Sequence, residues 1–432
     1  MARNDNANAA AESELDHTHE QGVRSWVPGA DDPATDFPVQ NLPFGVYRPK
    51  GTEVPRRGCV AIGDYALDLD AVDAATGPTL NELAAAGPGT WRDLRHTLFA
   101  LLTDPGKASQ SEKFLHLLSD IELGCPMQVP NFTDFYTSYY HAFNAGSLFR
   151  PDAPLSANFK WLPVAYHGRA SSVVVSGTEI VRPRGLRVVP GNDAPEYGAS
   201  LWLDYEVELG LVVGPGNAMS QPIPMGAAEA HIFGLTLLND WSARDIQAFE
   251  YDPLGPFLSK NFATTVSPWI ITLDALAPFR APAFERFAGD PECPGHLTSE
   301  HNTHAGHMDI NVEAWLTPAG SDEGSRLSRA SYATSYWTPA QLVAHHTSAG
   351  CPLATGDLLG TGTISGPEPD QAGALLELSS AGRQPLEVRP GVQRAFLEDH
   401  DTITLRGYCQ RDGFRRIGFG EARGTVLPAL ST

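Results

Sequence analysis

Glycine and proline interrupt this chain too often for a fold built from long helices. The sequence holds 41 glycines and 35 prolines among its 432 residues, and both residue types break helices. Short apolar runs bounded by turn residues, such as 44–47 and 59–69, are typical of strands instead. We therefore expect a mainly β fold with some α-helices.

Local composition divides the chain into three parts. Residues 1–22 are polar and acidic, which predicts a disordered tail. A proline-containing linker over 125–130 then separates residues 23–128 from residues 129–432.

Three helices are predicted from spacing and capping alone, outside the candidate site regions. Apolar residues at helical spacing favour 90–102, with Thr90 as the cap, and a second helix over 111–120. Thr338, followed by proline and by glutamine three residues on, forms a capping box for a helix that Gly350 ends.

Charge and cysteine usage limit the possible partners and compartment. The chain carries 51 acidic and 30 basic side chains, a formal net charge of −21. Nucleic acid and anionic membranes need a basic face, so we expect neither as a partner. We find no apolar run long enough to span a bilayer and no signal peptide. The five cysteines are scattered, which favours a cytoplasmic protein without disulfides.

The stretch 203–213 carries several carboxylates on one face of a predicted strand. Side chains alternate along a strand, so Asp204, Glu206 and Glu208 share one face while Tyr205 and Val207 take the other. This stretch alone is compatible with a solvated strand face, which is the more common case. The alternative is a hard cation, such as Ca²⁺, bound by carboxylate oxygens.

A second candidate region begins at residues 239–245, which read NDWSARD. Ser242 and Asp245 have the spacing of a capping box. The helix that follows would place Arg244, Gln247 and Tyr251 on one face, which suits an anion, although an ordinary surface helix has the same pattern.

Residues 131–141 are rich in aromatic side chains and contain one acid and one imidazole. If a helix runs from Thr133 to Gly146, Asp134 and His141 share a face. A core helix with a hydrogen-bonded histidine explains this pattern equally well. Weaker candidates are the turn at 166–169, the glycine-rich stretch 360–366 and four histidines between 296 and 307, which we expect in a mobile loop.

Five long motifs, in order, resemble the fumarylacetoacetase family. They are NFTDFY at 131–136, LPVAYHGRASSVVVSG at 162–177, NDWSARDIQAFEYDPLGPF at 239–257, GTISGPEP at 362–369 and GYCQRDGFRRIGFG at 407–420. The resemblance extends from about residue 25 to the C-terminus. It implies a small SH3-like N-terminal barrel, a larger C-terminal mixed β-sandwich roll, and a homodimer.

The same resemblance implies the reaction and the residues that perform it. Members hydrolyse a carbon–carbon bond of 4-fumarylacetoacetate, giving fumarate and acetoacetate, at the end of tyrosine and phenylalanine catabolism. The implied catalytic residues are His141 as the base, Glu377 as its partner, and Arg244, Gln247 and Lys260 as oxyanion donors. The implied substrate contacts are Tyr136, Arg150, Tyr166, Gln247, Tyr251 and Thr363. The implied metal ligands are Asp134, Glu206, Glu208 and Asp240 for Ca²⁺, and Asp240, Lys260 and Thr264 for Mg²⁺.

Two other functions are compatible with parts of this pattern. One is a hydrolase or decarboxylase for a shorter acylpyruvate-type acid, a group that generally lacks the N-terminal part and the 239–257 motif. The other is a catalytically silent calcium-binding scaffold. The presence of both His141 and Glu377 argues against that scaffold.

Overall fold

Five short strands near the N-terminus form an antiparallel sheet. The computed structural model of this protein describes residues 15–431 except 75, 190 and 193. The strands are β1 (Phe44–Pro49), β2 (Arg57–Ile62), β3 (Tyr65–Asp68), β4 (Leu115–Leu117) and β5 (Ile121–Leu123), in the order β4-β3-β2-β1-β5. The strands predicted at 44–47 and 59–69 are therefore confirmed.

The N-terminal helices differ in detail from the prediction. The long helix α2 (Pro88–Thr103) begins before Thr90, because Pro88 suits the first turn of a helix. Two shorter helices flank it, α1 (Asn81–Ala85) and α3 (Ala108–Ser111). The helix predicted over 111–120 is wrong: that region forms β4, whose Leu115 pairs with Leu67 of β3, so the sheet satisfies its backbone.

Part of the predicted disordered tail is folded. Residues 17–19 form a 3₁₀ turn capped by Asp16, and Thr18 and His19 are buried. The prediction of disorder is therefore wrong for residues 15–22. Its remainder, residues 1–14, lies outside the described residues.

The rest of the chain builds two larger sheets that pack against each other. The eight-stranded sheet has the order β7-β6-β22-β13-β14-β16-β8, with β17 pairing to β14. The five-stranded sheet has the order β21-β20-β25-β26-β9. The eight strands are β6 (Phe132–Phe135), β7 (Ala165–Gly168), β8 (Val173–Val175), β13 (Val207–Val213), β14 (Ile232–Asp240), β16 (Thr264–Val266), β17 (Ile271–Thr272) and β22 (Leu358–Gly360). The five are β9 (Ile180–Val181), β20 (Asn311–Thr317), β21 (Ser325–Ser331), β25 (Thr402–Cys409) and β26 (Ile417–Leu427).

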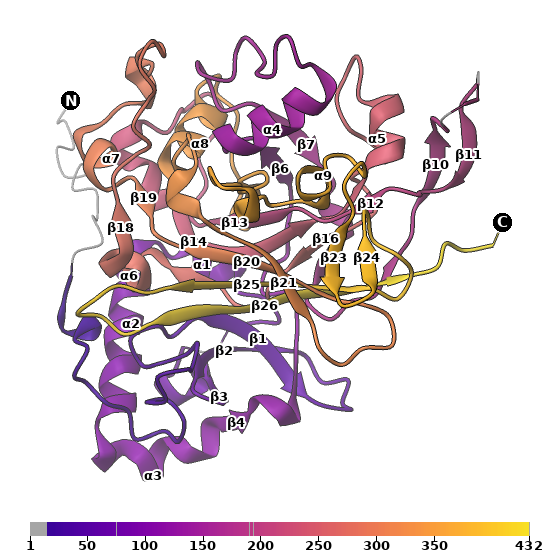
Figure 1. Ribbon diagram of the computed structural model, residues 1–432. Coiled ribbons are helices and arrows are strands. Elements are labelled where there is room, and N and C mark those ends of the chain that lie inside the picture. The colour runs from indigo at the N-terminus through magenta and orange to yellow at the C-terminus, as the bar shows by residue number, and fades with distance from the viewer. Residues whose placement is uncertain (1–14, 75, 190, 193, 432) are drawn as a thin grey trace.

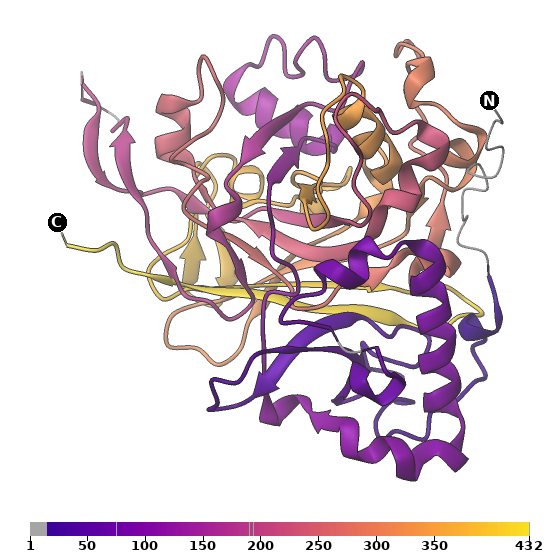
Figure 2. The ribbon, with the colours of Figure 1, turned by 180° about the vertical axis from the view of Figure 1, so that it is seen from behind.

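Short helices and two-stranded ribbons complete this part. The helices are α4 (Tyr139–Phe149), α5 (Arg244–Glu250), α6 (Leu273–Leu276), α7 (Glu300–Ala305), α8 (Pro339–Thr347) and α9 (Leu375–Leu378). The ribbons pair β10 (Arg184–Arg187) with β11 (Glu196–Ala199), β12 (Leu203–Asp204) with β15 (Ser242–Ala243), β18 (Arg280–Ala281) with β19 (His307–Met308), and β23 (Leu386–Arg389) with β24 (Val392–Arg394). Figures 1 and 2 show α4, α5, α8 and α9 on one side of β25 and β26, and the N-terminal strands on the other.

The helix predicted from the capping box at Thr338 is confirmed as α8. The Thr338 side chain accepts a hydrogen bond from the Gln341 backbone, and the Gln341 side chain accepts one from the Thr338 backbone. The histidine-rich stretch, in contrast, is no mobile loop: it contains α7, and His307 is buried with its ring bonded to the Ser335 carbonyl. Within the described part of the chain, no helix is both long and apolar enough to cross a membrane.

One face of the eight-stranded sheet is covered at one end by the N-terminal part. Phe233 of β14 is fully buried there, with ring contacts to Trp91 of α2 and Phe44 of β1 at 5.1 and 5.8 Å between ring centroids. Phe44 and Ile270 also exchange two backbone hydrogen bonds. Aromatic packing and backbone pairing therefore join the N-terminal part to the large sheet.

This junction predicts a large stability effect at Phe233. Phe233→Ala removes a fully buried ring between the two parts and should lower the free energy of unfolding by about 3–5 kcal/mol. Urea denaturation followed by tryptophan fluorescence measures the loss. The control is Met219→Ala, whose side chain is 74% exposed and should change stability by no more than about 0.5 kcal/mol. Equal effects of the two variants would contradict the conclusion that Phe233 helps to join the N-terminal part to the large sheet.

Candidate active site

Strand register brings four buried carboxylates together at the end of the eight-stranded sheet that the N-terminal part leaves uncovered. Asp134 lies opposite Tyr166 and Gly360, and Asp240 opposite Thr264. Directly opposed residues share a face, so these side chains point the same way as Glu208. One oxygen from each of Asp134, Glu206, Glu208 and Asp240 lies within 4.8 Å of the others.

Gly360 provides the room for two of these carboxylates. It lies between Asp134 and Glu208 on the sheet face. A Cβ at this position would stand 2.6 Å from Asp134 Oδ1 and 3.0 Å from Glu208 Oε2. The glycine-rich stretch 360–366 thus serves carboxylate packing here. It also supplies the Gly362 amide, which donates to Glu208 Oε2 at 3.0 Å.

Cationic side chains neutralise only one side of the carboxylate cluster. Lys260 Nζ donates to Glu206 and, at 2.7 Å, to Asp240, while Arg244 Nη1 donates to Glu206 at 2.7 Å. Burial favours protonated Glu206, but Lys260 and Arg244 outweigh it and hold the pKa of Glu206 below its ordinary value. Glu206 is therefore ionised at neutral pH.

The opposite side of the cluster lacks such partners. Burial and the charge of Asp240 raise the pKa of Asp134 to about 8, and burial and Asp134 raise the pKa of Glu208 well above its ordinary value. In the described part of the chain, Asp134 Oδ1 and Glu208 Oε1 are buried without a hydrogen-bond partner. Buried acceptors of this kind, grouped with two more carboxylates, have the donor set of a divalent cation site.

A histidine–carboxylate pair lies beside this cluster. Ser138 caps α4, so that His141 falls in its first turn, and His141 Nδ1 donates to Glu377 Oε2 of α9 at 2.6 Å. Asn144 and Ser365 also donate to Glu377, each at 3.0 Å. Burial opposes ionisation of Glu377, but His141 and these donors hold its pKa below the ordinary value. The carboxylate fixes the histidine tautomer and leaves Nε2 as an acceptor.

A cavity of about 590 Å³ joins these groups. The predicted site residues that line it are Asp134, Tyr136, His141, Arg150, Tyr166, Glu206, Arg244, Gln247, Tyr251, Lys260 and Thr363. The others lie just behind the wall: Glu208 and Asp240 in the cluster, Thr264 donating to Asp240 Oδ1 at 3.0 Å, and Glu377 behind His141. The structure thus brings every predicted site residue to one place.

Two local expectations about this region are wrong. Asp134 and His141 do not share a helix, because Asp134 belongs to strand β6 and α4 starts only after Ser138. Ser242 and Asp245 form no capping box, since Asp245 accepts from Ser200 Oγ and the Leu201 amide instead. Helix α5 still presents Arg244 and Gln247 on one face, 3.2 Å apart.

Asp204 has a role that sequence reasoning missed. Its side chain is fully buried and stays outside the carboxylate cluster. Asp204 Oδ2 accepts from Arg244 Nε at 2.9 Å and from the Leu376 amide at 3.0 Å, while Oδ1 accepts from the Leu375 amide at 2.8 Å. Asp204 therefore fastens Arg244 to the first turn of α9, the helix that carries Glu377. Its position two residues before Glu206 was the only signal in the sequence.

Known proteins resemble the chain over nearly its whole length. A family model described as fumarylacetoacetase N-terminal matches residues 40–126, and one described as fumarylacetoacetate (FAA) hydrolase C-terminal matches residues 132–427. The chain belongs to the fumarylacetoacetase family. The family assignment makes it a hydrolase, and it confirms the mainly β fold class that the sequence predicts.

Individual relatives agree with the family assignment. Fumarylacetoacetase of Arabidopsis thaliana is 45% identical over 413 residues, which cover 91% of this chain and 96% of that protein. Fumarylacetoacetase of Homo sapiens is 43% identical, covering 94% and 99%. A solved fumarylacetoacetate hydrolase from Exiguobacterium antarcticum shares the fold, with a TM-score of 0.51 and 18% identity over 90% of this chain and 99% of that one.

Asp204→Asn tests the junction between Arg244 and α9. The substitution keeps the shape of the side chain but removes the negative charge that pairs with the buried guanidinium of Arg244. The variant should lose about 3–5 kcal/mol of unfolding free energy, as buried ion pairs do when one partner is removed. Denaturant titration beside the exposed control Asp322→Asn measures this loss. A change as small as that of the control would show that Arg244 does not depend on Asp204.

The raised pKa of Asp134 predicts a proton-linked cation site. Without metal, Asp134 keeps its proton up to a pH of about 8, and a cation must displace that proton to bind. Binding of a divalent cation should therefore release a proton below pH 8 and tighten as the pH rises toward 8. Calorimetry in buffers of different ionisation enthalpy measures the release. If neither the number of protons released per bound cation nor the cation affinity changed with pH, the proposed link between proton and cation would be wrong.

The same shift fixes the pH dependence of stability without metal. The folded pKa of about 8 lies above the ordinary pKa of an aspartate, 3.8, so the contribution of Asp134 to stability is complete below pH 3.8 and is lost as the pH rises through 8. The melting temperature of the metal-free chain should therefore fall as the pH rises toward 8, and the part of this fall that Asp134 causes should be absent in Asp134→Asn.

Proposed function

We propose that this chain hydrolyses 4-fumarylacetoacetate to fumarate and acetoacetate, the last step of tyrosine and phenylalanine breakdown. The observation that carries this proposal is the buried His141–Glu377 pair facing a cavity beside four clustered carboxylates. The named relatives, 43–45% identical over most of the chain, support the same substrate.

His141 is the proposed general base. Its Nδ1 is engaged by Glu377, so Nε2 takes the proton from a water molecule that attacks the carbonyl carbon of the fumaryl group. The carbonyl becomes an oxyanion. When it re-forms, the carbon–carbon bond breaks, fumarate departs with the water oxygen, and the electron pair leaves with acetoacetate as an enolate. The proton held by His141 completes acetoacetate.

Arg244, Gln247 and Lys260 are the proposed donors to the oxyanion. Arg244 Nη2 is buried and has no hydrogen-bond partner in the described part of the chain, although the guanidinium lines the cavity. A preorganised, unpartnered donor of this kind stabilises charge that develops during the reaction. Asp204 holds the guanidinium in place from behind.

The proposed substrate contacts form the remaining wall of the cavity. Arg150 and Tyr251 are exposed at its mouth, where a guanidinium and a phenol suit the substrate carboxylates. Thr363 Oγ1 is buried without a partner in the described residues, so it is free to meet a substrate oxygen. Tyr136 packs edge-on against His141, with ring centroids 5.3 Å apart, and the Tyr166 hydroxyl donates to Asp240.

Asp134, Glu206, Glu208 and Asp240 fit a calcium ion. The fit rests on the two partnerless carboxylate oxygens and on an all-oxygen donor set. A cation bound there would act as a Lewis acid that polarises the substrate carbonyl and favours the enolate.

The proposed magnesium site fits only with a different atom of Lys260. The Lys260 ammonium has no lone pair and already donates to Glu206 and Asp240. Lys260 would therefore bind Mg²⁺ through its backbone carbonyl, together with Asp240 and Thr264 Oγ1.

We also propose two domains, 23–128 and 129–432, in a cytoplasmic homodimer. The two family matches fall on either side of the boundary. The five cysteines are free, which suits a reducing compartment.

The homodimer is supported by an exposed arm. Figures 1 and 2 show the β10–β11 hairpin extending from the body. Leu186, Tyr197 and Leu201 of this region are 46–63% exposed, and apolar side chains on such an arm support a second copy as its partner.

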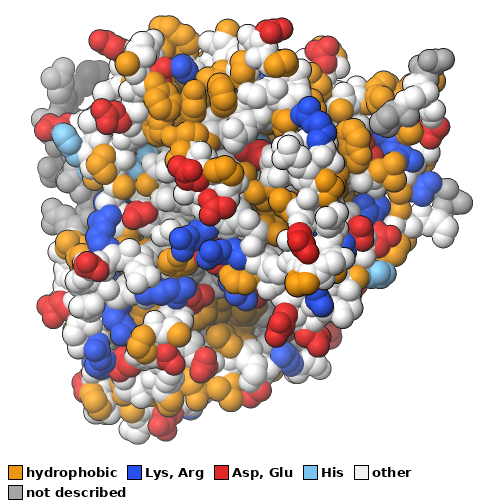
Figure 3. Space-filling view, in the orientation of Figure 1, with side chains coloured by type: hydrophobic (Ala, Val, Ile, Leu, Met, Phe, Trp, Pro, Cys, Tyr) orange, Lys and Arg blue, Asp and Glu red, His pale blue; other side chains and the backbone are white. Residues whose placement is uncertain are grey.

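The net charge does not argue against an anionic substrate. Figure 3 shows positive and negative side chains interspersed on one face, with several Lys and Arg side chains near its centre. Local cationic groups, rather than the total charge, decide whether a carboxylate can bind.

The decisive measurement is the loss of the diketone absorbance of fumarylacetoacetate, with and without a calcium chelator. Rapid, chelator-sensitive loss with fumarate as a product is expected. His141→Ala should lower the rate by about 10²- to 10⁴-fold with calcium affinity unchanged, whereas the exposed control His304→Ala should keep full activity.

Two results would contradict the proposal in different ways. If the chain did not turn over fumarylacetoacetate in the presence of Ca²⁺ and Mg²⁺ but did turn over a shorter acylpyruvate, the shorter acid would be the substrate. Full activity of His141→Ala would show that His141 is not the base, while the assignment of the substrate would stand.

A further inference from the structure

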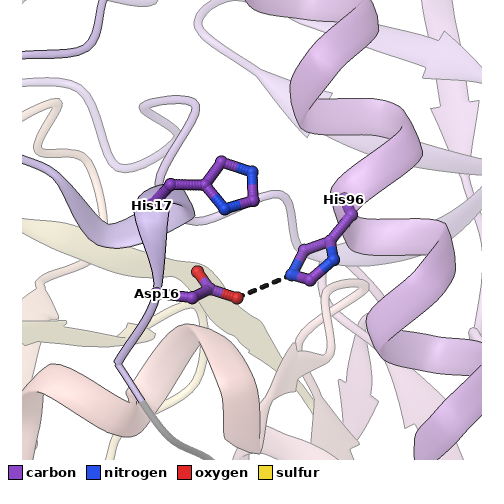
Figure 4. A group of neighbouring side chains, drawn as sticks. All are labelled: Asp16, His17 and His96. Carbon is purple, nitrogen blue, oxygen red and sulfur yellow. Dashed lines mark hydrogen bonds and ion pairs between the residues drawn. The ribbon is translucent and has the colours of Figure 1, made fainter.

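A second group of potential metal ligands lies far from the active site, where the N-terminal segment meets α2. Asp16 and His17 come from the segment, and His96 comes from α2. One ligand atom from each of the three lies within 4.8 Å of the others. Figure 4 shows the two imidazoles and the carboxylate grouped between these two elements.

Asp16 and His17 offer groups that can bind a metal directly, and His96 offers Nε2 once the metal displaces the proton that this nitrogen donates to Asp16. Asp16 Oδ2 and His96 Nε2 are 2.6 Å apart. Burial opposes ionisation of Asp16, but hydrogen bonds from Thr18 and His96 hold its pKa below the ordinary value, so it is a carboxylate. In the described part of the chain, the ring nitrogens of His17 have no hydrogen-bond partner, and its ring contacts are with His96 and Phe99.

The backbone around these ligands is fixed in advance. Thr18 and His19 are buried, and Arg95 Nε donates to Thr18 Oγ1 at 3.0 Å. The ring of His19 is fully used: Nδ1 accepts from the Asp16 amide and Nε2 donates to the Asp274 carbonyl. His19 therefore positions the segment, and Asp16 and His17 are left to face His96.

The distances permit a metal ion after small side-chain rotations. Ligands at about 2.0–2.2 Å from a tetrahedral zinc ion lie roughly 3.4 Å from one another. The Asp16–His96 pair is closer than this, at 2.6 Å, because the two share a hydrogen bond that a metal ion would replace, and the most distant pair of ligand atoms is within 4.8 Å. Exposed His17 has the freedom to close the remaining gap.

We propose that Asp16, His17 and His96 form a binding site for a divalent transition-metal ion such as Zn²⁺. Two imidazoles and one carboxylate suit zinc and its neighbours rather than calcium or magnesium, which prefer oxygen ligands. Water completes the coordination. The bound ion links the N-terminal segment to α2 and, through His19 and Asp274, ties it more firmly against the C-terminal part.

Zinc titration of the full chain, with the active site saturated by Ca²⁺ and Mg²⁺, tests this site. Calorimetry should find one zinc ion bound per chain. Loss of a direct ligand should weaken zinc binding by more than the roughly 10- to 100-fold typical of an outer-shell change. His17→Gln and His96→Gln should both show this loss. His304→Gln, which removes an exposed histidine elsewhere, should bind zinc as the unaltered chain does.

Hydrogen exchange gives a second readout that does not depend on activity. Zinc should slow exchange of the amides of residues 17–20 in the unaltered chain and in His304→Gln, but not in His17→Gln. His17 is exposed, so its variant should fold normally. Zinc affinity that is the same in His17→Gln, His96→Gln and the unaltered chain would overturn the proposal, as would the absence of zinc binding once Ca²⁺ and Mg²⁺ are present.

Discussion

The register of β6, β22, β13 and β14 is the constraint on which the site depends. It places Asp134, Glu208 and Asp240 on one face of a single sheet, with Glu206 beside them. A one-residue slip of any strand would turn its carboxylate to the opposite face. Buried like charges are costly, so the surrounding features, namely Lys260, Arg244 and the bare backbone of Gly360, are consequences of this register.

The apolar end of the same sheet face explains how such a cluster is tolerated. Phe132, Val212 and Leu358 lie on the same strands as the carboxylates or their neighbours, and they pack in the core shared with the N-terminal part. Burial of these side chains gives the strands a stability that does not depend on the charged end. One sheet can thus combine a conventional core with a site that would be unstable alone.

Sequence patterns predicted those features that depend on neighbouring residues. Alternation placed Glu206 and Glu208 on one face, and the capping box at Thr338 identified α8. The patterns failed where distant segments decide. Residues 131–141 form a strand and a helix rather than one helix, because β6 pairs with β22 more than 200 residues further on. Asp245 resembles a cap but is bound by Ser200, and nothing near Asp204 reveals that it meets α9.

The pair of His141 and Glu377 has a consequence for how the enzyme is made. The two residues are 236 positions apart in the chain, whereas the last of the four clustered carboxylates is Asp240. A ribosome completes the carboxylate set well before it reaches α9. Strand β22 (Leu358–Gly360), which joins β6 to β13, also comes late, so neither the carboxylate cluster nor the histidine pair can assemble until the last part of the chain has been synthesised.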